Sequence, residues 1–336
     1  MSQVLRLGTR GSQLALWQAN TVAAHLAATG GPPCEIVVIR TSGDRLQNAP
    51  LSEVGGKRLF VKEIEDALLR GEIDLAVHSS KDMPAVLPEG LAIAGVLPRE
   101  DPLDAMVLPV MAATTAQAIG DQPSAMTSIE DLVKHLGQSP SIGTGSVRRI
   151  AQLMRLFPGA GFTPIRGNLD TRLRKLDEGA HHALVLAAAG LRRLGFASRI
   201  SLALPAAACV PAPGQGIVAI ETREDDGTVR AMIERISDAE AGAALTAERA
   251  LVEALGGGCQ TPVGALATPG DGDTLELVAI VVALDGSRAV RGQAHGSRSD
   301  AAAIGKGVGA QLIADGADEI LADARHAQGA VEGIQP

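Results

Sequence analysis

An ammonium group and a carboxylate are adjacent where a predicted strand ends. Residues 74–84 read Asp-Leu-Ala-Val-His-Ser-Ser-Lys-Asp-Met-Pro, and the strand expected at 75–78 brings Lys81 and Asp82 to its carboxyl end. Ligands of α/β proteins bind at that end of the strands. A carboxylate held there can stabilise a developing cation or move a proton. The alternative is an ordinary surface turn, which is commoner for a Lys-Asp pair taken alone.

Cys259 is the second group that could do chemistry. It follows three consecutive glycines after a predicted helix, a setting that suits a thiol which a bulky group must reach. A thiol reacts as its thiolate and needs to be accessible. The sequence offers no single acid or base as its partner. Cys34 and Cys209 have no such setting and are interpreted as structural.

Small-residue turns that carry arginine recur after the predicted strands. Such strand–turn–helix junctions direct backbone N–H groups at an anion, and a guanidinium can bind a carboxylate through two hydrogen bonds. A single turn of this kind would be read as a helix cap with a surface arginine, but several in one chain favour a polyanionic ligand. The side chains concerned are Arg10, Ser12, Thr144, Ser146, Arg148, Arg149, Arg166, Arg172 and Arg193.

The charge of the chain is unevenly distributed. Residues 146–199 hold ten basic and three acidic side chains, whereas the whole chain has a net charge of −8. A basic segment in an acidic protein indicates a local anion site. The overall charge and the 1% of aromatic residues argue against binding to nucleic acid or to anionic membranes.

Cysteine usage and hydropathy indicate the compartment. The three cysteines show no CxxC spacing, and we expect neither a disulfide framework nor a metal site. The amino-terminal residues lack an apolar signal region, and no apolar run approaches the ~20 residues of a membrane helix. We therefore expect a cytoplasmic protein.

Strands and helices alternate over the first two-thirds of the chain, which is typical of α/β architecture. With 336 residues, the chain is expected to form two or three domains. Strands are expected at 4–7, 35–40, 75–78, 91–96, 141–143, 163–166, 183–186 and 217–221, and helices at 13–28, 62–69, 147–157, 169–178 and 240–255.

Two proline-rich segments, 97–102 and 210–216, are interpreted as crossovers between domains. They predict a discontinuous first domain of residues 1–101 and 214–236, with a second domain of residues 102–213 inserted in it. A ligand cleft is expected between them. Residues 111–140 are weakly patterned, with one helix near 129–136.

The pattern changes after about residue 238. Strands at 275–284 and 288–295 are joined by Asp285 and Gly286, which is a hairpin signal, and a last helix is expected at 301–326. Residues 237–336 are therefore expected to form a smaller α+β domain.

Nine segments together resemble the hydroxymethylbilane synthase (porphobilinogen deaminase) family. They occur in the order found in the family and cover nearly the whole chain. They are GTRGSQLALWQA at 8–19, GGKRLFVKEIEDALL at 55–69, DLAVHSSKDMP at 74–84, REDPLDA at 99–105, GTGSVRR at 143–149, IRGNLDTRLRKLD at 165–177, AGLRRLG at 189–195, PAPGQG at 211–216 and ERALVEALGGGCQTPVG at 248–264.

The resemblance implies an α/β fold of two lobes like those of type II periplasmic binding proteins, with mixed sheets, plus a smaller C-terminal α+β domain. It implies that Cys259 carries a dipyrromethane cofactor through a thioether. The implied reaction condenses four porphobilinogen molecules head to tail on this primer with loss of ammonia, and then releases hydroxymethylbilane by hydrolysis. The resemblance also implies a monomer that needs no metal.

The resemblance further implies roles for individual residues. Asp82 matches the catalytic aspartate, which stabilises the cation formed on the pyrrole nitrogen when ammonia leaves. The family's cofactor-binding positions match Arg10, Ser12, Lys81, Thr144, Ser146, Arg148 and Arg149. Its substrate-binding positions match Arg10, Ser12, Lys57, Arg149, Arg166, Arg172 and Arg193.

The sequence departs from the family pattern in a few places. Gly145 stands where many relatives have serine, Glu53 stands where some have lysine, and residues 111–140 are longer than in typical bacterial members. The first two departures put individual ligand contacts in doubt. Asp82 and Cys259 are both kept.

A second class of function is a two-lobed protein that binds a small anion without catalysis. It would account for the arginine turns and the basic segment, but not for the glycine-rich approach to Cys259 or for a third domain. A regulatory effector domain would need a DNA-binding module, and no helix-turn-helix segment precedes the lobes.

Overall fold

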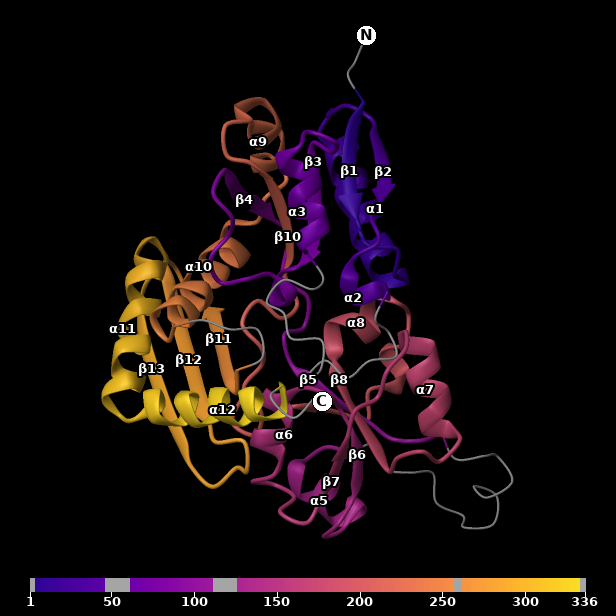
Figure 1. The fold of residues 1–336 in the computed structure, drawn as a ribbon, viewed down its shortest axis with the longest axis vertical. Coiled ribbons are helices and arrows are strands. Elements are labelled where there is room, and N and C mark those ends of the chain that lie inside the picture. The colour runs from indigo at the N-terminus through magenta and orange to yellow at the C-terminus, as the bar shows by residue number, and fades with distance from the viewer. Residues whose placement is uncertain (1–3, 46–60, 111–125, 257–260, 333–336) are drawn as a thin grey trace.

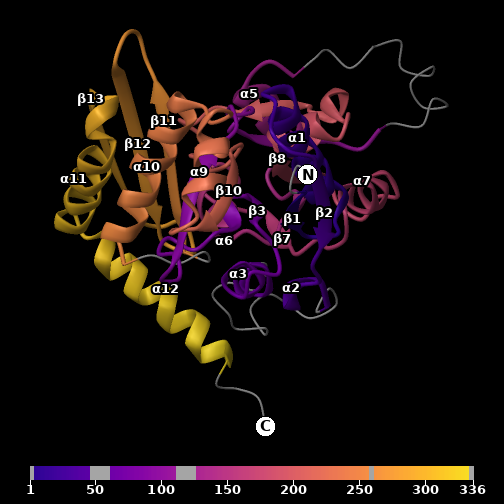
Figure 2. The same ribbon diagram turned by 90° about the horizontal axis from the view of Figure 1, so that it is seen from above.

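A computed structural model describes residues 4–45, 61–110, 126–256 and 261–332 (Figure 1). Its strands form three sheets, two of five strands and one of three. In Figure 1 the first five-stranded sheet lies above the second, and Figure 2 shows the three-stranded sheet with its helices to one side of both. We refer to the two five-stranded sheets with their helices as the first and second lobes.

The sheet of the first lobe is mixed, with the strand order β2-β1-β3-β10-β4. Strands β1, β2 and β3 are parallel, and β10 runs antiparallel to both of its neighbours. Helices α1 and α9 cover one face, and α3 packs against the other. The strands are β1 (Leu5–Thr9), β2 (Cys34–Val38), β3 (Leu75–Ser79), β4 (Leu91–Val96) and β10 (Val218–Arg223), and the helices are α1 (Gln13–Ala28), α2 (Ser42–Arg45), α3 (Lys62–Leu69), the 3-10 helix η1 (Ser80–Asp82) and α9 (Gly227–Glu234).

The second lobe is also mixed, with the order β7-β6-β8-β5-β9. Strand β6 is parallel to β7 and β8, whereas β5 is antiparallel to β8 and β9. The chain enters this sheet after β4 and returns to the first after β9, at the two proline-rich segments. The strands are β5 (Asp104–Val107), β6 (Ser141–Gly143), β7 (Gly161–Thr163), β8 (Ala183–Ala187) and β9 (Leu202–Leu204), and the helices are α5 (Ile129–Leu136), α6 (Val147–Leu153), α7 (Leu169–Asp177), α8 (Ala188–Arg193) and the 3-10 helix η2 (Ala197–Arg199).

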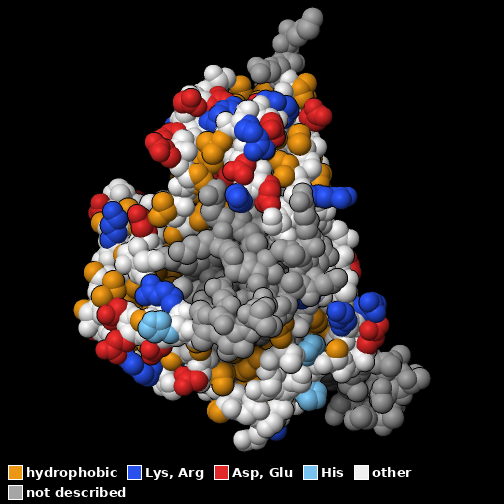
Figure 3. Space-filling model, viewed as in Figure 1, with side chains coloured by type: hydrophobic (Ala, Val, Ile, Leu, Met, Phe, Trp, Pro, Cys, Tyr) orange, Lys and Arg blue, Asp and Glu red, His pale blue; other side chains and the backbone are white. Residues whose placement is uncertain are grey.

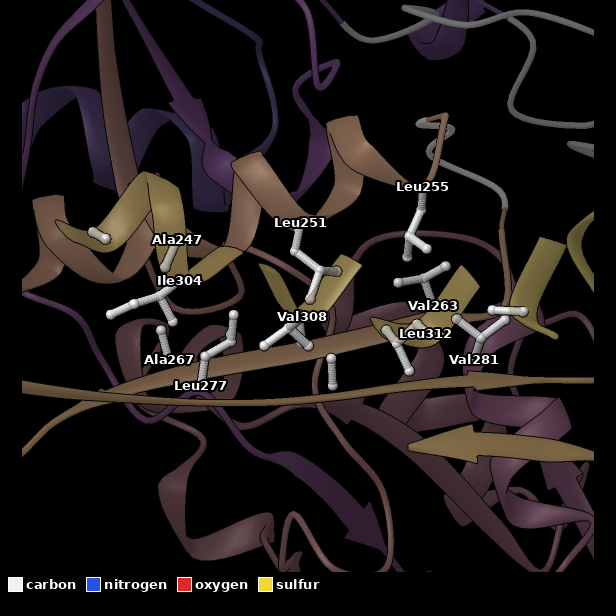
Figure 4. Packing of buried hydrophobic residues seen from close by; sticks show 14 of the residues in the cluster. Ala247, Leu251, Leu255, Val263, Ala267, Leu277, Val281, Ile304, Val308 and Leu312 are labelled. Atoms are coloured by element: carbon white, nitrogen blue, oxygen red, sulfur yellow. The ribbon is translucent and has the colours of Figure 1, made fainter. Parts of the chain in front are cut away.

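The third sheet is antiparallel, in the order β11-β12-β13, and helices cover one of its faces. Figure 4 shows Leu251 of α10 and Val308 of α11 packed over Leu277 of β12. Alternate residues of β12 point to the opposite face, where Ile280 and Val282 meet Ala151 of α6 and Val210 of the segment that returns from the second lobe. The elements are α10 (Ala239–Ala254), β11 (Val263–Pro269), β12 (Thr274–Val282), β13 (Ala289–Ser297), the 3-10 helix η3 (Arg298–Asp300), α11 (Ala301–Ala314) and α12 (Ala317–Glu332).

The expected fold class of two mixed α/β lobes with a smaller α+β unit is confirmed, and three local expectations were wrong. The helix expected at 147–157 ends at Leu153, where a turn follows. The last helix divides into α11 and α12 because Gly316 adopts a φ of 92° between them, a left-handed conformation that ends a helix. The strand expected at 163–166 lies earlier, at β7, because residues 161–163 are the ones that pair with β6, from Ser141 opposite Gly161 to Gly143 opposite Thr163.

The described surface carries side chains of both charges. On the face shown in Figure 3, basic and acidic side chains are interspersed among the residues that the structure describes. Within the same residues, no helix is both long and apolar enough to cross a membrane.

Helices α10 and α11 cross so closely that their contact requires glycine. A Cβ atom on Gly305 would lie 2.1 Å from the carbonyl oxygen of Ala247. We expect Gly305→Ala to lower the free energy of unfolding by about 1–3 kcal/mol, because the helices must move apart. Denaturant unfolding measures this loss.

Gly307 provides the matched control on the same helix, since a Cβ there would meet nothing within 4 Å. Gly307→Ala should leave the protein as stable or raise the free energy of unfolding by roughly 0.5–1 kcal/mol, through helix propensity. Equal stability of the two variants would contradict the close crossing.

Candidate active site

Strand β3 and the short helix η1 position Lys81 and Asp82. Residues 75–77 of β3 are buried, so the strand is a fixed support for η1 at its carboxyl end. The Ser80 N–H donates to the carbonyl oxygen of Ile217 at 3.0 Å, which attaches η1 to the segment that returns from the second lobe. Gly214 of that segment has a φ of 72° and lies so close that a Cβ atom would be 2.5 Å from Ser80 Oγ. The junction of the lobes is therefore packed directly against the Lys81–Asp82 pair.

The electrostatic setting of Lys81 is mixed. Burial lowers the pKa of Lys81 to about 8, with the charges of Arg149 and Arg148 acting in the same direction and those of Asp82 and Asp104 opposing them. Its ammonium donates to Gln215 Oε1 at 3.5 Å. Lys81 is thus mainly charged at neutral pH, although it is much closer to its titration midpoint than an exposed lysine.

Helix α6 holds two adjacent arginines against one buried carboxylate. Ser146 caps this helix by accepting from the N–H of Arg149. Arg148 Nη1 lies 2.7 Å from Asp104 Oδ2, and Arg149 Nη2 lies 2.8 Å from Asp104 Oδ1. Burial would raise the pKa of the Asp104 carboxyl, but the two guanidinium charges outweigh it and hold the pKa far below its ordinary value. Asp104 is therefore the negative partner of both guanidinium groups at neutral pH.

Two more arginines extend this positive region. Arg172 at the start of α7 donates to the carbonyl oxygen of Gly167 at 2.9 Å. Burial lowers the pKa of Arg172, and the charges of Arg149 and Arg166 lower it further. We call Arg148, Arg149, Arg166 and Arg172 the arginine cluster. Since Asp104 neutralises only part of its charge, the cluster is suited to an anion with several acidic groups.

Arg193 approaches the site from the end of α8. Its Nη2 donates to the carbonyl oxygen of Gly216 at 2.7 Å, and its guanidinium lies over the ring of Trp17, 5.5 Å from the centroid. Arg193 and Lys81 line the same small cavity, together with Leu14 and Ser79. Arg193 thus links α1 of the first lobe to α8 of the second, beside Lys81.

The other predicted residues occupy less central positions. Ser12 caps α1 by accepting from the N–H of Ala15, and Arg10 pairs with Asp44 through Nη2 and Oδ1 at 2.5 Å. Thr144 is buried, and its Oγ1 accepts from the N–H of Ser146. The predictions for Lys57, Glu53 and Cys259 lie outside the described residues.

The sequence reasoning missed three buried polar residues around the site. Asp104, Gln215 and Glu248 are each at most 1% exposed. Glu248 of α10 accepts from Arg99, from the N–H of Gly214 and from the N–H of Ala267, so it joins both crossover segments to the third sheet. The segments REDPLDA and PAPGQG contain two of these residues, but nothing in the sequence pairs them.

The donor types fit an acidic organic group better than a metal ion. Guanidinium, ammonium and hydroxyl groups predominate at the site, and they bind carboxylates. In the part of the chain that the structure describes, no cluster of three His, Cys, Asp or Glu side chains could hold a metal ion.

Two family models match the chain. Residues 5–231 match the model described as porphobilinogen deaminase, dipyromethane cofactor binding domain, and residues 243–314 match the one described as porphobilinogen deaminase, C-terminal domain. The porphobilinogen deaminase of Syntrophobacter fumaroxidans is 45% identical over 95% of this chain and 97% of its own length. Those of Geobacter metallireducens and Bordetella parapertussis are 44% and 46% identical over 95% of this chain, covering 94% and 96% of their own lengths.

Solved structures show a weaker likeness. The BvgS VFT2 domain of Bordetella pertussis is 17% identical, with a TM-score of 0.38 over 69% of this chain and 86% of that one. An ancestral cationic amino acid solute binding protein is 18% identical, with a TM-score of 0.39 over 69% of this chain and 88% of that one. At such scores the likeness carries no argument about function, and the fold class rests on the sheets themselves.

Proposed function

The chain belongs to the porphobilinogen deaminase family, and on that premise we propose that Asp82 performs the chemistry of the family's reaction while the arginine cluster holds its acidic ligands. The chain is a transferase of tetrapyrrole biosynthesis that acts on porphobilinogen and uses a dipyrromethane cofactor. The observation that carries the proposed roles is geometric. Lys81, the neighbour of Asp82, lines one cavity with Arg193, and Gln215 joins its ammonium to Asp104, which pairs with Arg148 and Arg149.

The residues at the site fit the cofactor by their charge. Each pyrrole unit of this chemistry carries carboxylate side chains, and a partly neutralised arginine cluster suits such a group. The residues that would hold it are Arg10, Ser12, Lys81, Thr144, Ser146, Arg148 and Arg149, with a thioether at Cys259. When bound, the dipyrromethane supplies the pyrrole to which the next ring is joined.

Asp82 is the residue suited to the reacting atoms. Its carboxylate can accept the N–H of a substrate pyrrole and stabilise the positive charge that develops on the ring when ammonia leaves. It can also take up the proton released from the carbon that forms the new bond. The arginines cannot act as bases because they stay protonated, so their part is to hold the rings in position.

Substrate binding shares residues with cofactor binding. We assign Arg10, Ser12, Lys57, Arg149, Arg166, Arg172 and Arg193 to the carboxylates of the incoming porphobilinogen and of the growing chain. The location of Arg193 beside Lys81, with a contact to α1 of the first lobe, supports its place in this set.

The domain organisation, the oligomeric state and the location belong to the same proposal. We propose domains at residues 1–101 with 214–236, at 102–213 and at 237–336, since the strands of each sheet fall within one of these spans. The family resemblance supports a monomer. The cysteine usage described above supports a cytoplasmic location.

Incubation of the purified full chain with porphobilinogen tests the proposed function. We expect ammonia release, with four substrate molecules consumed for each linear tetrapyrrole formed. Binding of porphobilinogen without release of ammonia would instead favour the non-catalytic two-lobed anion-binding protein.

A further inference from the structure

We infer that Asp104 and Gln215 are positioning residues that hold Arg149 and Lys81 in place where the two lobes meet. This inference rests on the proposed function of those two cations. Asp104 and Gln215 act from behind the site, through the arginine and the lysine, and are not assigned to the reacting atoms.

Asp104 is the buried centre of the network. It is 0% exposed and accepts from Arg148 Nη1 at 2.7 Å, from Arg149 Nε at 2.9 Å and from Gln215 Nε2 at 3.0 Å. The Cys209 thiol donates to the same carboxylate at 3.4 Å. One negative charge therefore faces two guanidinium groups, which fixes their orientation and leaves one positive charge over. An arginine held in this way loses little side-chain freedom when an anion binds.

Gln215 extends the network from the second lobe to the first. Its Nε2 also donates to the carbonyl oxygen of Pro102 at 2.7 Å, and its Oε1 accepts from Lys81 Nζ at 3.5 Å. Pro102 lies on the segment that leaves the first lobe, and Gln215 lies on the segment that returns to it. A single amide thus joins both crossovers to Lys81 and to Asp104.

The network sets the charge state of Lys81 as well as its place. The charged groups that act most strongly on Lys81 are Asp82 on η1, Asp104 on β5, and Arg148 and Arg149 on α6, and Arg193 of α8 lines the same cavity. The carboxylates and the oxygen of Gln215 favour the protonated amine, whereas the two arginines and burial favour the neutral one. Loss of the Gln215 contact should therefore lower the pKa of Lys81. As the pH is raised, the kcat/KM of the variant should then begin to fall at a lower pH than that of the unmodified chain.

A pH profile of kcat/KM separates positioning from simple stability. In Gln215→Leu we expect kcat/KM at pH 8 to fall about tenfold or more. The alkaline limb of the profile, where kcat/KM declines with rising pH, should move to lower pH by about half a unit or more. Gln215→Asn keeps the amide, but its shorter side chain cannot reach both Lys81 and Asp104. We expect it to shift the alkaline limb in the same direction. This second variant keeps the test decisive if the leucine variant does not fold.

Gln152→Leu is the matched control. Gln152 is also a buried glutamine, and its amide bonds both the N–H and the carbonyl oxygen of Val210 without reaching Lys81. We expect Gln152→Leu to lower Tm by about as much as Gln215→Leu does, while the alkaline limb stays at the pH of the unmodified chain. An unmoved limb in both Gln215 variants, or an equal shift in Gln152→Leu, would overturn the inference.

Intact-mass measurement of the same preparations supplies a readout that does not depend on turnover. Because Arg149 is assigned to the cofactor, Asp104→Asn should leave a smaller fraction of the chains carrying the covalent adduct than the unmodified chain does. Equal loading in Asp104→Asn would overturn the part of the inference that concerns Arg149. Failure of the unmodified chain to turn over porphobilinogen would count against the proposed function alone.

Discussion

Asp82→Asn is expected to reduce kcat by about a thousandfold without disturbing the fold. The asparagine keeps the shape of the side chain but loses the charge that stabilises a cation and the ability to take up a proton. Asp82 is only partly buried, on the short helix η1, so the change should cost little stability. Single-turnover kinetics and thermal unfolding of the variant measure the two effects separately.

Glu89→Gln is the control for Asp82, because Glu89 is an exposed carboxylate on the loop that follows η1. The control should keep the activity of the unmodified chain. A value of kcat for Asp82→Asn within about tenfold of the unmodified chain would remove Asp82 from the catalytic role.

The largest loss of stability is expected at Glu248, where three parts of the chain meet. Its carboxylate is 0% exposed and accepts from Arg99 at 2.6 Å, from the N–H of Gly214 at 2.5 Å and from the N–H of Ala267 at 2.7 Å. Glu248→Ala leaves the Arg99 guanidinium and two buried N–H groups without this acceptor. The free energy of unfolding should fall by about 3–5 kcal/mol, which denaturant unfolding will measure.

Glu253→Ala on the same helix is the comparison, since Glu253 is exposed. It should unfold at the same denaturant concentration as the unmodified chain. If Glu248→Ala also unfolded at the denaturant concentration of the unmodified chain, apolar packing rather than this carboxylate would hold the junction.

The elements that the sequence predicts best are those with a local signal. In α1 the local signals are the cap Ser12 and the apolar residues that recur on one face of the helix, of which Ala15, Ala19, Val22 and Leu26 are buried. This helix begins and ends where it was predicted. Strands β5 and β9, with four and three residues, are too short to show a period. They form because they pair with each other and β5 pairs with β8, a contact between distant segments.

The same distinction applies to the site. Lys81 and Asp82 could be placed because a strand end is a local feature. The Gln215–Asp104 contact joins residues 111 positions apart, and no property of either segment alone indicates it. The sequence predicted Arg148 as an anion-binding residue, and the structure adds that its side chain is 5% exposed and bonded to Asp104, a pairing that only the tertiary structure could show.

The reaction on a covalent primer can be tested directly by the mass of the protein as purified. We expect intact-mass analysis to find the chain heavier by a dipyrromethane, digestion to map the addition to the peptide that contains Cys259, and Cys259→Ser to lack both the addition and turnover. A fully active chain with the mass of its unmodified sequence would contradict the account.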